Sequence, residues 1–288
     1  MTSRILIQLD SDLQPSSFDS IVAIDAGVDH MLRYGGVQVT SVEPLVHGAM
    51  FTRGGDDLRH TAIFIGGSDV MVAERLLAAC KDAFFGPVRV SLMLDANGCN
   101  TTASAAVVAA SRHIDLKDAK AVVLGGTGPV GRRVAQLMAS DGADVTLTSR
   151  SKQRAEVACK EIANKVKNGN LTAAAIGNGI GTKVLDGAQI VIGCGAAGFE
   201  LVKERTIAGI ESLKVAIDLN AVPPAGIGGV SVTDKAAPLG KGVAYGAIGV
   251  GGLKMKTHRA AIKQLFESND QVLDANEIYQ IAKDCAGS

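Results

Sequence analysis

The sequence predicts an α/β fold built on a doubly wound parallel sheet, for two reasons. Short apolar runs, such as Ala121–Leu124 and Val145–Thr148, alternate along most of the chain with segments of helical length, such as Val130–Asp141. These runs stay apolar at successive positions, as strands do when helices cover both faces of their sheet. Strands that alternate with helices predict βαβ units, and hence parallel pairing.

The other expected elements follow the same alternation. Further strands are expected at Ile5–Leu9, Ala62–Ile65, Val88–Leu94, Ile190–Ile192 and Val215–Leu219, and further helices at Met71–Phe84, Thr101–Arg112 and Lys152–Lys167. A polar break at His113–Lys120 and a glycine-rich stretch at Ala221–Gly252 indicate domain boundaries. We therefore expect a first domain at residues 1–112, a nucleotide-binding domain at 113–248, and C-terminal helices at 249–288 that pack back on the first domain.

Composition excludes several classes of function. Acidic and basic residues balance at 29 each, which gives no electrostatic reason to expect a nucleic acid or an acidic membrane as partner. Only 3% of the residues are aromatic, so a surface that stacks nucleic-acid bases is not expected. The cysteines form no CxxC pair and the histidines are scattered, so no metal site is predicted. No apolar run reaches the roughly 18 residues that span a bilayer, and the first residues do not resemble a signal peptide, so we expect a cytoplasmic protein.

The most informative segment is the turn after Ala121–Leu124. Its residues match the G-x-G-x-x-G pattern, as Gly126, Thr127, Gly128, Pro129, Val130 and Gly131. The pattern alone is weak, but here it follows an apolar strand, opens an amphipathic helix and precedes a second strand. Gly126 is expected to permit the tight turn, Gly128 to let the backbone approach a pyrophosphate, and Gly131 to let helix and strand pack closely. Free N–H groups at the helix N-terminus would bind the phosphates, so the segment predicts a Rossmann-type dinucleotide site.

The end of the second strand indicates which dinucleotide is bound. NAD enzymes usually carry an Asp or Glu there, but this chain has Ser149, Arg150 and Lys152. A hydroxyl and two cations suit a 2′-phosphate, which Arg150 can bind through two parallel hydrogen bonds. The alternative is that both cations are ordinary solvated residues, although cations are mildly unfavourable at a helix N-terminus. We therefore predict NADP as the cofactor.

Two further loops of this domain are expected near the nicotinamide end of the cofactor. The first contains Cys194, Gly195 and Ala196, and the second contains Asn220. Both follow parallel strands, at whose carboxyl ends open α/β sheets bind ligands. A simple tight turn explains the first loop equally well, and Cys194 has no basic neighbour that would make it a nucleophile.

In the first domain, polar residues gather between the strand Val88–Leu94 and the next helix. Asn100 and Thr101 are able to cap that helix, so a structural role for the residues from Asn100 to Thr102 is as reasonable as a functional one. Asp95 and Asn97 are harder to assign to capping, and we expect them to face a cleft.

Segments along the whole chain resemble those of the bacterial NADP-dependent methylene-tetrahydromethanopterin dehydrogenases. The shared segments include FDSIVAIDAGVDH, FFGPVRVSLMLDANGCNTT, VVLGGTGPVG, DLNAVPPAGIGG and YGAIGVGGLKMKTHRA. The resemblance implies an oxidoreductase of one-carbon metabolism that transfers a hydride from a methylene-pterin carrier to NADP and leaves the methenyl cation. It also implies a substrate domain beside the nucleotide domain, a homo-oligomer (a trimer) and no metal. Some related enzymes accept NAD or tetrahydrofolate, and a single sequence leaves that preference open.

The residues suit this chemistry. Two nitrogens flank the carbon that loses the hydride and stabilise the cation, so positioning and electrostatics suffice without an acid–base pair. A pterin presents adjacent N–H donors that a carboxylate accepts in pairs. Lys254 and Lys256 cannot share one helical face, so at most one is expected to point inward, and the resemblance favours Lys256. The expected catalytic residues are Lys256 and Asp95, and the expected substrate-binding residues are Asp19, Asp25, Asn97, Asn100, Thr102 and Lys254.

Several alternatives stay open. Tyr279 and Lys283 match the Y-x-x-x-K of short-chain dehydrogenases, but the glycine loop has a different spacing from that family. A folate dehydrogenase–cyclohydrolase would carry Lys four residues after Tyr34, where this chain has Gln38, so no cyclohydrolase activity is expected. The others are a methylene-tetrahydrofolate dehydrogenase and a non-catalytic NADP-binding sensor.

Overall fold

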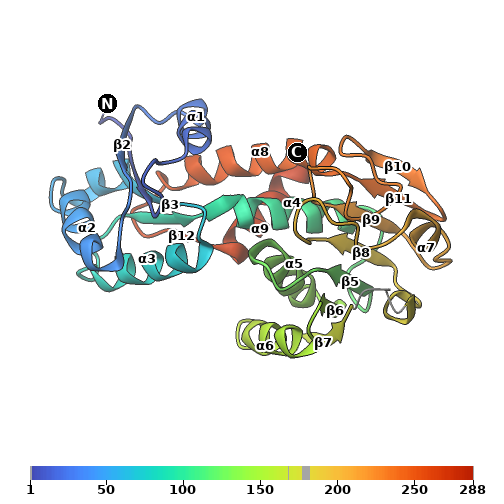
Figure 1. Ribbon diagram of the computed structural model, residues 1–288. Coiled ribbons are helices and arrows are strands. Elements are labelled where there is room, and N and C mark those ends of the chain that lie inside the picture. The colour runs from blue at the N-terminus through green and yellow to red at the C-terminus, as the bar shows by residue number, and fades with distance from the viewer. Residues whose placement is uncertain (1, 168, 177–181, 288) are drawn as a thin grey trace. The chain divides into compact units, whose positions relative to one another are not determined.

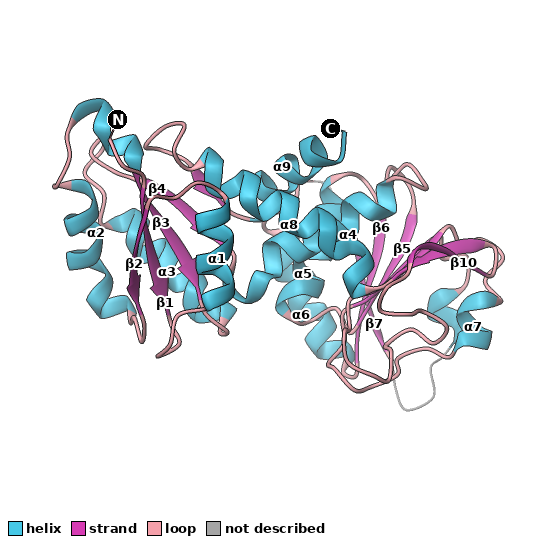
Figure 2. Ribbon diagram, turned by 90° about the horizontal axis from the view of Figure 1, so that it is seen from above, coloured by secondary structure: helices cyan, strands magenta, loops and turns pink. Residues whose placement is uncertain are grey.

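The computed structural model describes residues 2–167, 169–176 and 182–287, and it divides into two compact units. One unit comprises Met1–Thr101 with Met255–Ser288, and the other comprises Thr102–Lys254. Each unit contains one sheet with helices packed on it (Figures 1 and 2), so the predicted α/β class is confirmed. The division falls within α4 (Cys99–Ser111) and α8 (Ala247–Gln264), and the domain boundaries expected after residues 112 and 248 stay predictions.

The first unit is built on a five-stranded parallel sheet with the strand order β12-β4-β3-β1-β2. Its strands are β1 (Ile5–Asp10), β2 (His30–Tyr34), β3 (Thr61–Gly66), β4 (Ser91–Leu94) and β12 (Val272–Leu273). Its helices are α1 (Ser17–Asp25), α2 (Val42–Met50), α3 (Val70–Asp82) and α9 (Ala275–Gly287), with 3-10 turns at Val39–Ser41, Gly55–His60 and Ala96–Gly98. Because every pair is parallel, β1, β3 and β4 end at the same edge of the sheet.

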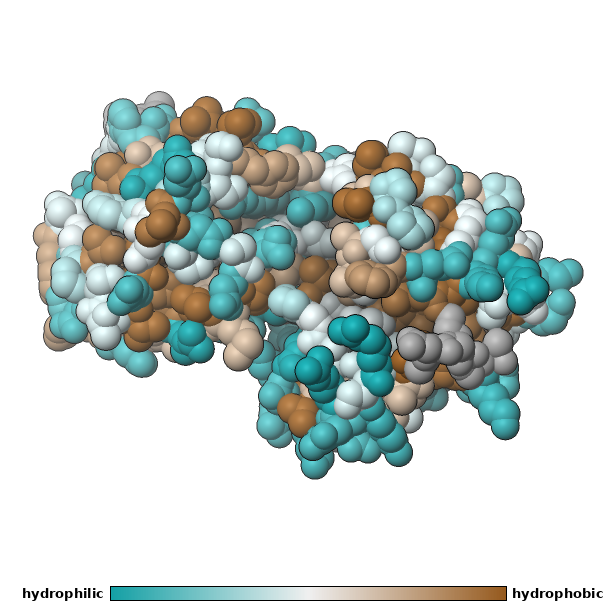
Figure 3. All heavy atoms as spheres, in the orientation of Figure 1, coloured by the Kyte–Doolittle hydropathy of each residue, from teal (hydrophilic) through white to brown (hydrophobic). Residues whose placement is uncertain are grey.

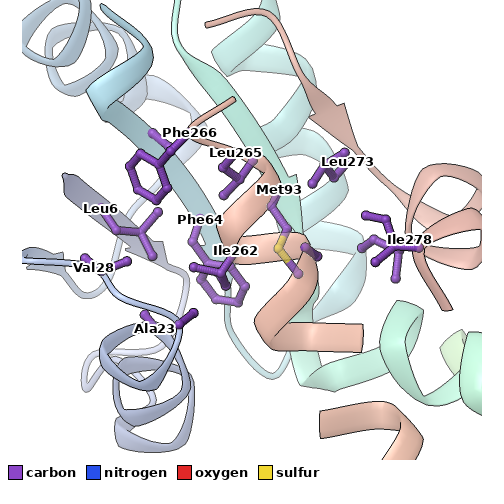
Figure 4. Packing of buried hydrophobic residues seen from close by; sticks show 14 residues of the cluster. Leu6, Ala23, Val28, Phe64, Met93, Ile262, Leu265, Phe266, Leu273 and Ile278 are labelled. Atoms are coloured by element: carbon purple, nitrogen blue, oxygen red, sulfur yellow. The ribbon is translucent and has the colours of Figure 1, made fainter. Parts of the chain in front are cut away.

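One face of this sheet forms an apolar core with the two C-terminal helices (Figure 4). Leu6, Phe64 and Met93 project from neighbouring strands and pack with Ile262 of α8 and Ile278 of α9. Phe64 and Met93 are fully buried, and a side chain of this size contributes about 1.5–3 kcal/mol when it leaves water. The last part of the chain therefore completes the core of the first unit, and β12 extends its sheet beside β4.

The described residues of the second unit form a seven-stranded sheet with the order β10-β11-β9-β8-β5-β6-β7, in which β10 and β11 pair antiparallel and the other neighbours pair parallel. Its strands are β5 (Lys120–Leu124), β6 (Asp144–Ser149), β7 (Asn170–Ala175), β8 (Ile190–Gly193), β9 (Val215–Asp218), β10 (Lys235–Leu239) and β11 (Gly242–Tyr245). Its further helices are α5 (Pro129–Ser140), α6 (Lys152–Ala163) and α7 (Glu204–Ala208), with a 3-10 turn at Thr182–Leu185. The strand order reverses between β5 and β8, and such a point is where doubly wound sheets bind nucleotides.

The strands that the sequence analysis missed include those with exposed side chains. β2 and β7 are edge strands whose residues are mostly exposed or half-buried, so neither shows a continuous apolar run. β4 begins at Ser91 rather than at Val88, because Val88 pairs with Phe85 in a separate antiparallel bridge. α6 ends at Ala163, ahead of the predicted Lys167.

The turn between β4 and α4 corrects one interpretation of the sequence. Asp95 is fully buried, and its carboxylate accepts from the backbone N–H groups of Asn100 (2.9 Å) and Thr101 (3.0 Å) and from the Thr101 hydroxyl (2.6 Å). The two N–H groups belong to the first turn of α4, where they have no partner within the helix. Asp95 therefore caps α4, which is the role that its sequence context did not indicate.

Replacing Asp95 with Ala should destabilise the fold, because the substitution leaves these buried donors without their acceptor. We expect the free energy of unfolding to fall by about 2–4 kcal/mol, which urea titration followed by circular dichroism measures. Asp25→Ala is the matched control, since Asp25 is exposed at the end of α1 and should change stability by less than about 0.5 kcal/mol. Equal effects of the two substitutions would contradict the capping role.

Candidate functional site

The turn between β5 and α5 brings two loops of the second unit together. Gly125 makes the tight turn, since its φ of +63° lies in the left-handed region that glycine adopts freely. A Cβ on Gly125 would lie 2.7 Å from the Cα of Gly195, in the loop after β8. The expectation that Gly126 makes this turn is corrected accordingly, because the glycine with positive φ stands one position earlier.

Gly126 and Gly131 let α5 pack directly on the loop. A Cβ on Gly131 would lie 2.6 Å from the Cα of Gly126, so the helix and the loop approach as closely as backbone allows. By contrast, a Cβ on Gly128 would meet no atom within 4 Å, and Pro129 is the first helical residue, where a missing N–H costs nothing. The start of α5 therefore offers open space beside unpaired backbone N–H groups and a positive helix end. These residues fit a pyrophosphate, which requires such a close backbone approach.

Arg132 ties this loop to the neighbouring helix. Its Nε donates to the carbonyl oxygen of Thr127 (2.9 Å), and its guanidinium forms an ion pair with Glu161 of α6. The next loop residue, Gly128, directly precedes α5. The Arg132–Glu161 pair therefore fixes the carbonyl at the middle of the glycine loop from outside it.

The end of β6 carries the cations that the sequence analysis identified. Arg150 and Lys152 are exposed, Ser149 is mostly buried, and Ser151 caps α6 by accepting from the N–H of Arg154. Lys152 lies 3.7 Å from Glu156 in an exposed ion pair, which contributes little stability.

An open pocket of about 360 Å³ lies where α5 and α6 begin. It is lined by Thr127, Arg132, Gln153, Arg154 and Val157. Two arginines in this lining add to the exposed cations at positions 150 and 152. Such a concentration of guanidinium groups suits a phosphate better than an uncharged ribose hydroxyl.

The loop after β9 holds its own shape through Asp218. This buried carboxylate accepts from the backbone N–H groups of Asn220 (3.1 Å), Gly226 (2.6 Å) and Ile227 (3.1 Å). Burial raises the pKa of Asp218, and these N–H groups lower it. The Asn220 side chain accepts from the N–H of Val222 (3.0 Å) and donates to the carbonyl of Pro224 (3.1 Å), so it supports the loop to which it belongs.

The loop after β8 offers backbone rather than reactive side chains. Ala196 is exposed, and Gly195 lies against Gly125. Burial raises the pKa of the Cys194 thiol, and the charge of Asp218 raises it further. Cys194 is therefore a thiol rather than a thiolate at neutral pH, which agrees with the expectation that it is not a nucleophile.

At the carboxyl edge of the first sheet, ionisable side chains gather beside His258 of α8. His258 is buried, its Nδ1 lies 4.0 Å from Oδ2 of Asp95, and its ring stacks on Phe64 with 5.7 Å between the centroids. Asp10, the last residue of β1, accepts from the N–H groups of Asp12 (2.9 Å) and Ser16 (3.2 Å). Asp10 and Asp95 thus both hold turns.

Asp19 belongs to the same group but differs from the other carboxylates. It lies half-buried in the first turn of α1, which Ser16 caps by accepting from the Asp19 N–H. Burial raises the pKa of the Asp19 carboxyl to about 6; His258 lowers it, Asp95 raises it, Ser16 lowers it and Asp10 raises it. Asp19 therefore titrates near neutral pH, which is common for carboxylates of functional sites.

The remaining substrate candidates of the first half lie in different surroundings. Asn100 is buried, and its amide donates to the Leu94 carbonyl (2.6 Å) and to Asp274 (2.9 Å), so it joins β4 to the start of α9. Asn97 is exposed with a φ of +51°, and Thr102 is half-buried on α4. Asn100 thus has a structural role, which the sequence analysis had left open.

The two candidate lysines of α8 differ in exposure. Lys254 is half-buried and Lys256 is exposed. Burial raises the pKa of the Cys285 thiol on α9, and the charge of Lys256 lowers it.

His258 is the residue that the sequence analysis did not identify. A single histidine is more often a core residue than a functional one, and its neighbours Phe64 and Asp95 lie far away in the sequence. The sequence feature that could have indicated a functional role for His258 is its place close after Lys254 and Lys256 on the same helix.

Tyr279 does not have the surroundings of a catalytic tyrosine. It is a buried residue of α9, and the Lys283 Nζ lies 4.2 Å from the centroid of its ring. This position disfavours the short-chain dehydrogenase alternative. Tyr34 is 40% exposed on the edge strand β2.

Within residues 2–167, 169–176 and 182–287, no group of three or more His, Cys, Asp or Glu side chains is arranged to hold a metal ion. Over the same described parts of the chain, none of the helices has the length and apolar character needed to cross a membrane.

The chain is similar to two proteins of Methylorubrum extorquens along its full length. It is 45% identical over 289 residues to one named Bifunctional protein MdtA, covering 99% of this chain and 100% of that one. It is 31% identical over 306 residues to one named NAD(P)-dependent methylenetetrahydromethanopterin dehydrogenase, covering 100% of both chains. A family model described as methylene-tetrahydromethanopterin dehydrogenase, N-terminal, matches residues 17–97.

Solved structures with low sequence identity share the fold. Quinate dehydrogenase from Corynebacterium glutamicum in complex with NAD superimposes with a TM-score of 0.53 at 13% identity, over 97% of this chain and 98% of that one. The ligand-free 5-ketofructose reductase of Gluconobacter sp. strain CHM43 gives a TM-score of 0.52 at 15% identity, over 98% of each chain. These structures support the Rossmann-type architecture alone, whereas the full-length relatives confirm the resemblance seen in the sequence: the chain belongs to the family of NAD(P)-dependent methylene-tetrahydromethanopterin dehydrogenases.

Proposed function

We propose that the chain oxidises methylene-tetrahydromethanopterin to the methenyl form in one-carbon metabolism, with NADP as hydride acceptor. The observation that carries the proposal is the full-length similarity to a relative of that name. In this step the methylene C–H bond breaks, both electrons leave with the hydrogen as hydride, and the two flanking nitrogens stabilise the cation. No proton is transferred, so the protein contributes positioning and an electrostatic field rather than an acid–base pair.

The residues of the second unit divide the binding of the cofactor between them. NADP, when bound, supplies the hydride acceptor. Gly128 and the start of α5 would hold its pyrophosphate, and Arg150 and Lys152, with the Ser149 hydroxyl, would hold its 2′-phosphate. Gly195, Ala196 and Asn220 would border the nicotinamide end, where Asn220 acts by shaping its loop.

Residues of the first hundred or so positions and of α8 would bind the reduced pterin. We keep Lys256 as the group that orients the substrate, by the family resemblance, with Lys254, Asn97 and Thr102 as further candidates. Asp95 and Asn100 would act indirectly, since their hydrogen bonds fix the turn between β4 and α4.

Two alternatives share this site. The carriers tetrahydromethanopterin and tetrahydrofolate differ in methyl groups and tail, so methylene-tetrahydrofolate is a second candidate substrate. A non-catalytic NADP sensor would need the cofactor residues alone, and it leaves the similarity of the first half unexplained.

The proposal includes a homo-oligomer in the cytoplasm. Apolar side chains lie exposed over α1 (Figure 3), among them Ile21 and Ile24, which are 60% and 61% exposed. A second copy of the chain is the occupant that the family resemblance suggests for such a surface. Light scattering of the purified protein measures the number of subunits.

The proposed activity is tested by mixing the purified protein with NADP and each methylene carrier and following the absorbance of NADPH. We expect turnover with methylene-tetrahydromethanopterin, with or without turnover of the folate carrier. Turnover of the folate carrier alone would establish the first alternative, and NADP binding without turnover of either carrier would establish the sensor.

Reversing the charge at Arg150 should change the preference between cofactors. Arg150→Asp places a carboxylate where the 2′-phosphate would bind, so we expect KM for NADP to rise about 100-fold while KM for NAD changes less than about threefold. Lys160→Asp is the matched control, because it makes the same charge change in the last turn of α6. A parallel loss with both cofactors would place Arg150 outside the 2′-phosphate site.

Removing the partner of Arg132 should loosen the glycine loop. Glu161→Gln breaks the ion pair but leaves the bond from Arg132 to Thr127, so we expect Kd for NADP to rise about two- to fivefold, in keeping with a partly exposed ion pair. Fluorescence titration with NADP measures this effect. Glu156→Gln removes the other ion pair of α6 and should not weaken binding. Unchanged affinity in Glu161→Gln would show that the loop keeps its shape without this pair.

A further inference from the structure

We propose that Asp19 of α1 accepts the N–H donors at the edge of the reduced pterin, and that His258, whose ring centroid lies 6.4 Å from that of the adjacent Phe18, is a positioning residue for this carboxylate. The inference rests on the proposed function and deepens it, because it selects one residue from the three aspartates that the sequence left as candidates.

Asp95 and Asp25 do not suit this role. The carboxylate of Asp95 is fully buried and accepts from two backbone N–H groups and a hydroxyl, so it caps α4. Asp25 is exposed at the opposite end of α1 from Ser16. Asp10, a further carboxylate at this edge of the sheet, accepts from the N–H groups of Asp12 and Ser16.

Asp19 combines partial burial with acceptor sites that remain for a ligand. Ser16 is its hydrogen-bonding neighbour, and a carboxylate offers about four lone-pair sites, so acceptor sites remain for a ligand. Asp19 is half-buried, which excludes part of the water that would compete for those sites. The flat edge of a pterin presents two adjacent N–H donors, and a carboxylate can accept both in a bidentate pair.

Aromatic and imidazole rings lie near Asp19. Phe18, its neighbour in α1, is 49% exposed, and its ring centroid lies 6.4 Å from that of His258. The ring of His258 also stacks on the buried ring of Phe64. A half-exposed aromatic side chain beside a half-buried carboxylate combines an apolar face with a polar anchor, which is how sites for flat polar ligands are built.

Two negatively charged side chains act on Asp19. These are Asp95, at the end of β4, and Asp10, at the end of β1, and both raise the pKa of Asp19, whereas His258 on α8 lowers it. Because the pKa lies at about 6, Asp19 is ionised at neutral pH and loses its charge as the pH falls below that value. Binding of the carrier should therefore weaken on acidification while binding of NADP does not.

The test compares Asp19→Asn with Asp25→Asn, the same change on the same helix at an exposed position. We expect Asp19→Asn to raise KM about 10- to 100-fold, the loss of one charge-assisted bidentate contact, with kcat changed less than about threefold. The factor should be equal for the methanopterin and folate carriers, since both share the pyrimidine edge. Affinity for NADP, measured by fluorescence titration, reports that the variant is folded and should not change.

The pH dependence of KM for the carrier distinguishes a binding role of Asp19 from a purely structural one, because a structural role would not change it. In the wild type, KM for the carrier should rise as the pH falls through about 6. Asp19→Asn should lack that transition, and His258→Asn should shift it to higher pH, because the group that lowers the pKa of Asp19 is removed. If His258→Asn does not fold, as judged by NADP binding, the pH profiles of the wild type and of Asp19→Asn still decide the role of Asp19. The role of His258 is then tested with His258→Gln in place of His258→Asn.

The stability of the ligand-free protein gives an independent measurement. A carboxyl whose pKa is raised in the folded state contributes stability at low pH and loses that contribution as the pH rises through the raised value. Asp19→Asn should therefore unfold at a higher urea concentration than the wild type at pH 8, with no such gain at pH 4.

The outcomes separate this inference from the proposed function. Turnover by the wild type together with an unchanged KM in Asp19→Asn would overturn the role of Asp19 alone. If the transition in KM against pH stays at the same pH in His258→Asn or His258→Gln, the role of His258 would be overturned. Failure of the wild type to oxidise either carrier would reject the proposed function, and this inference with it.

Discussion

Parallel pairing is the constraint on which the rest of the structure depends. In each unit the carboxyl ends of neighbouring parallel strands meet at one edge, so that loops distant in sequence come together there. In the first unit this edge gathers Asp10 and Asp95 beside α8. In the second it brings the loops after β5 and β8 so close that Gly125 and Gly195 leave no room for a Cβ between them. Strand direction therefore determines which loops come together in each unit, whatever side chains those loops carry.

The two sheet edges present different chemical groups to a ligand. The second unit offers backbone: a glycine loop with open space at Gly128, a helix N-terminus, and cations at the end of β6. Phosphates are recognised well by such groups, because backbone N–H donors cost no side-chain entropy to hold in place. The first unit offers carboxylates, which suit a ligand that presents N–H donors rather than charge. A dinucleotide and a reduced pterin make these complementary demands.

Most of the second unit could be predicted from the sequence, because its signals are local. The loop from Gly125 to Gly131 has its strand, turn and helix within one continuous segment, and the tight contact between Gly126 and Gly131 lies inside that segment. Even so, the pattern misplaced the turn by one residue. The pattern records which glycines recur, and only the backbone angles show that Gly125 is the residue with positive φ.

The first unit was less predictable, because its site is made by contacts between distant segments. Asp95 reaches the N–H groups of Asn100 and Thr101 across a 3-10 turn in which Asn97 adopts a φ of +51°, and no simple spacing rule for helix caps describes that path. His258 acquires its surroundings only when α8 packs on the sheet beside Phe64. The resemblance to a family indicated which segments matter, but it could not show which aspartate of those segments keeps acceptor capacity.

The chemistry of the reaction explains why such a site tolerates buried carboxylates without an acid–base pair. Hydride transfer from a carbon between two nitrogens needs no proton donor, so the ionisable groups of the first unit are free to serve the fold and to bind the substrate. Asp10, Asp95 and Asp218 offset the cost of burial by accepting backbone N–H groups. For Asp19 the one hydrogen bond that lowers the pKa comes from the Ser16 side chain, and burial raises this pKa to about 6. Since no proton moves in the reaction, the proposed role of Asp19 predicts that its titration acts on affinity for the carrier rather than on the chemical step.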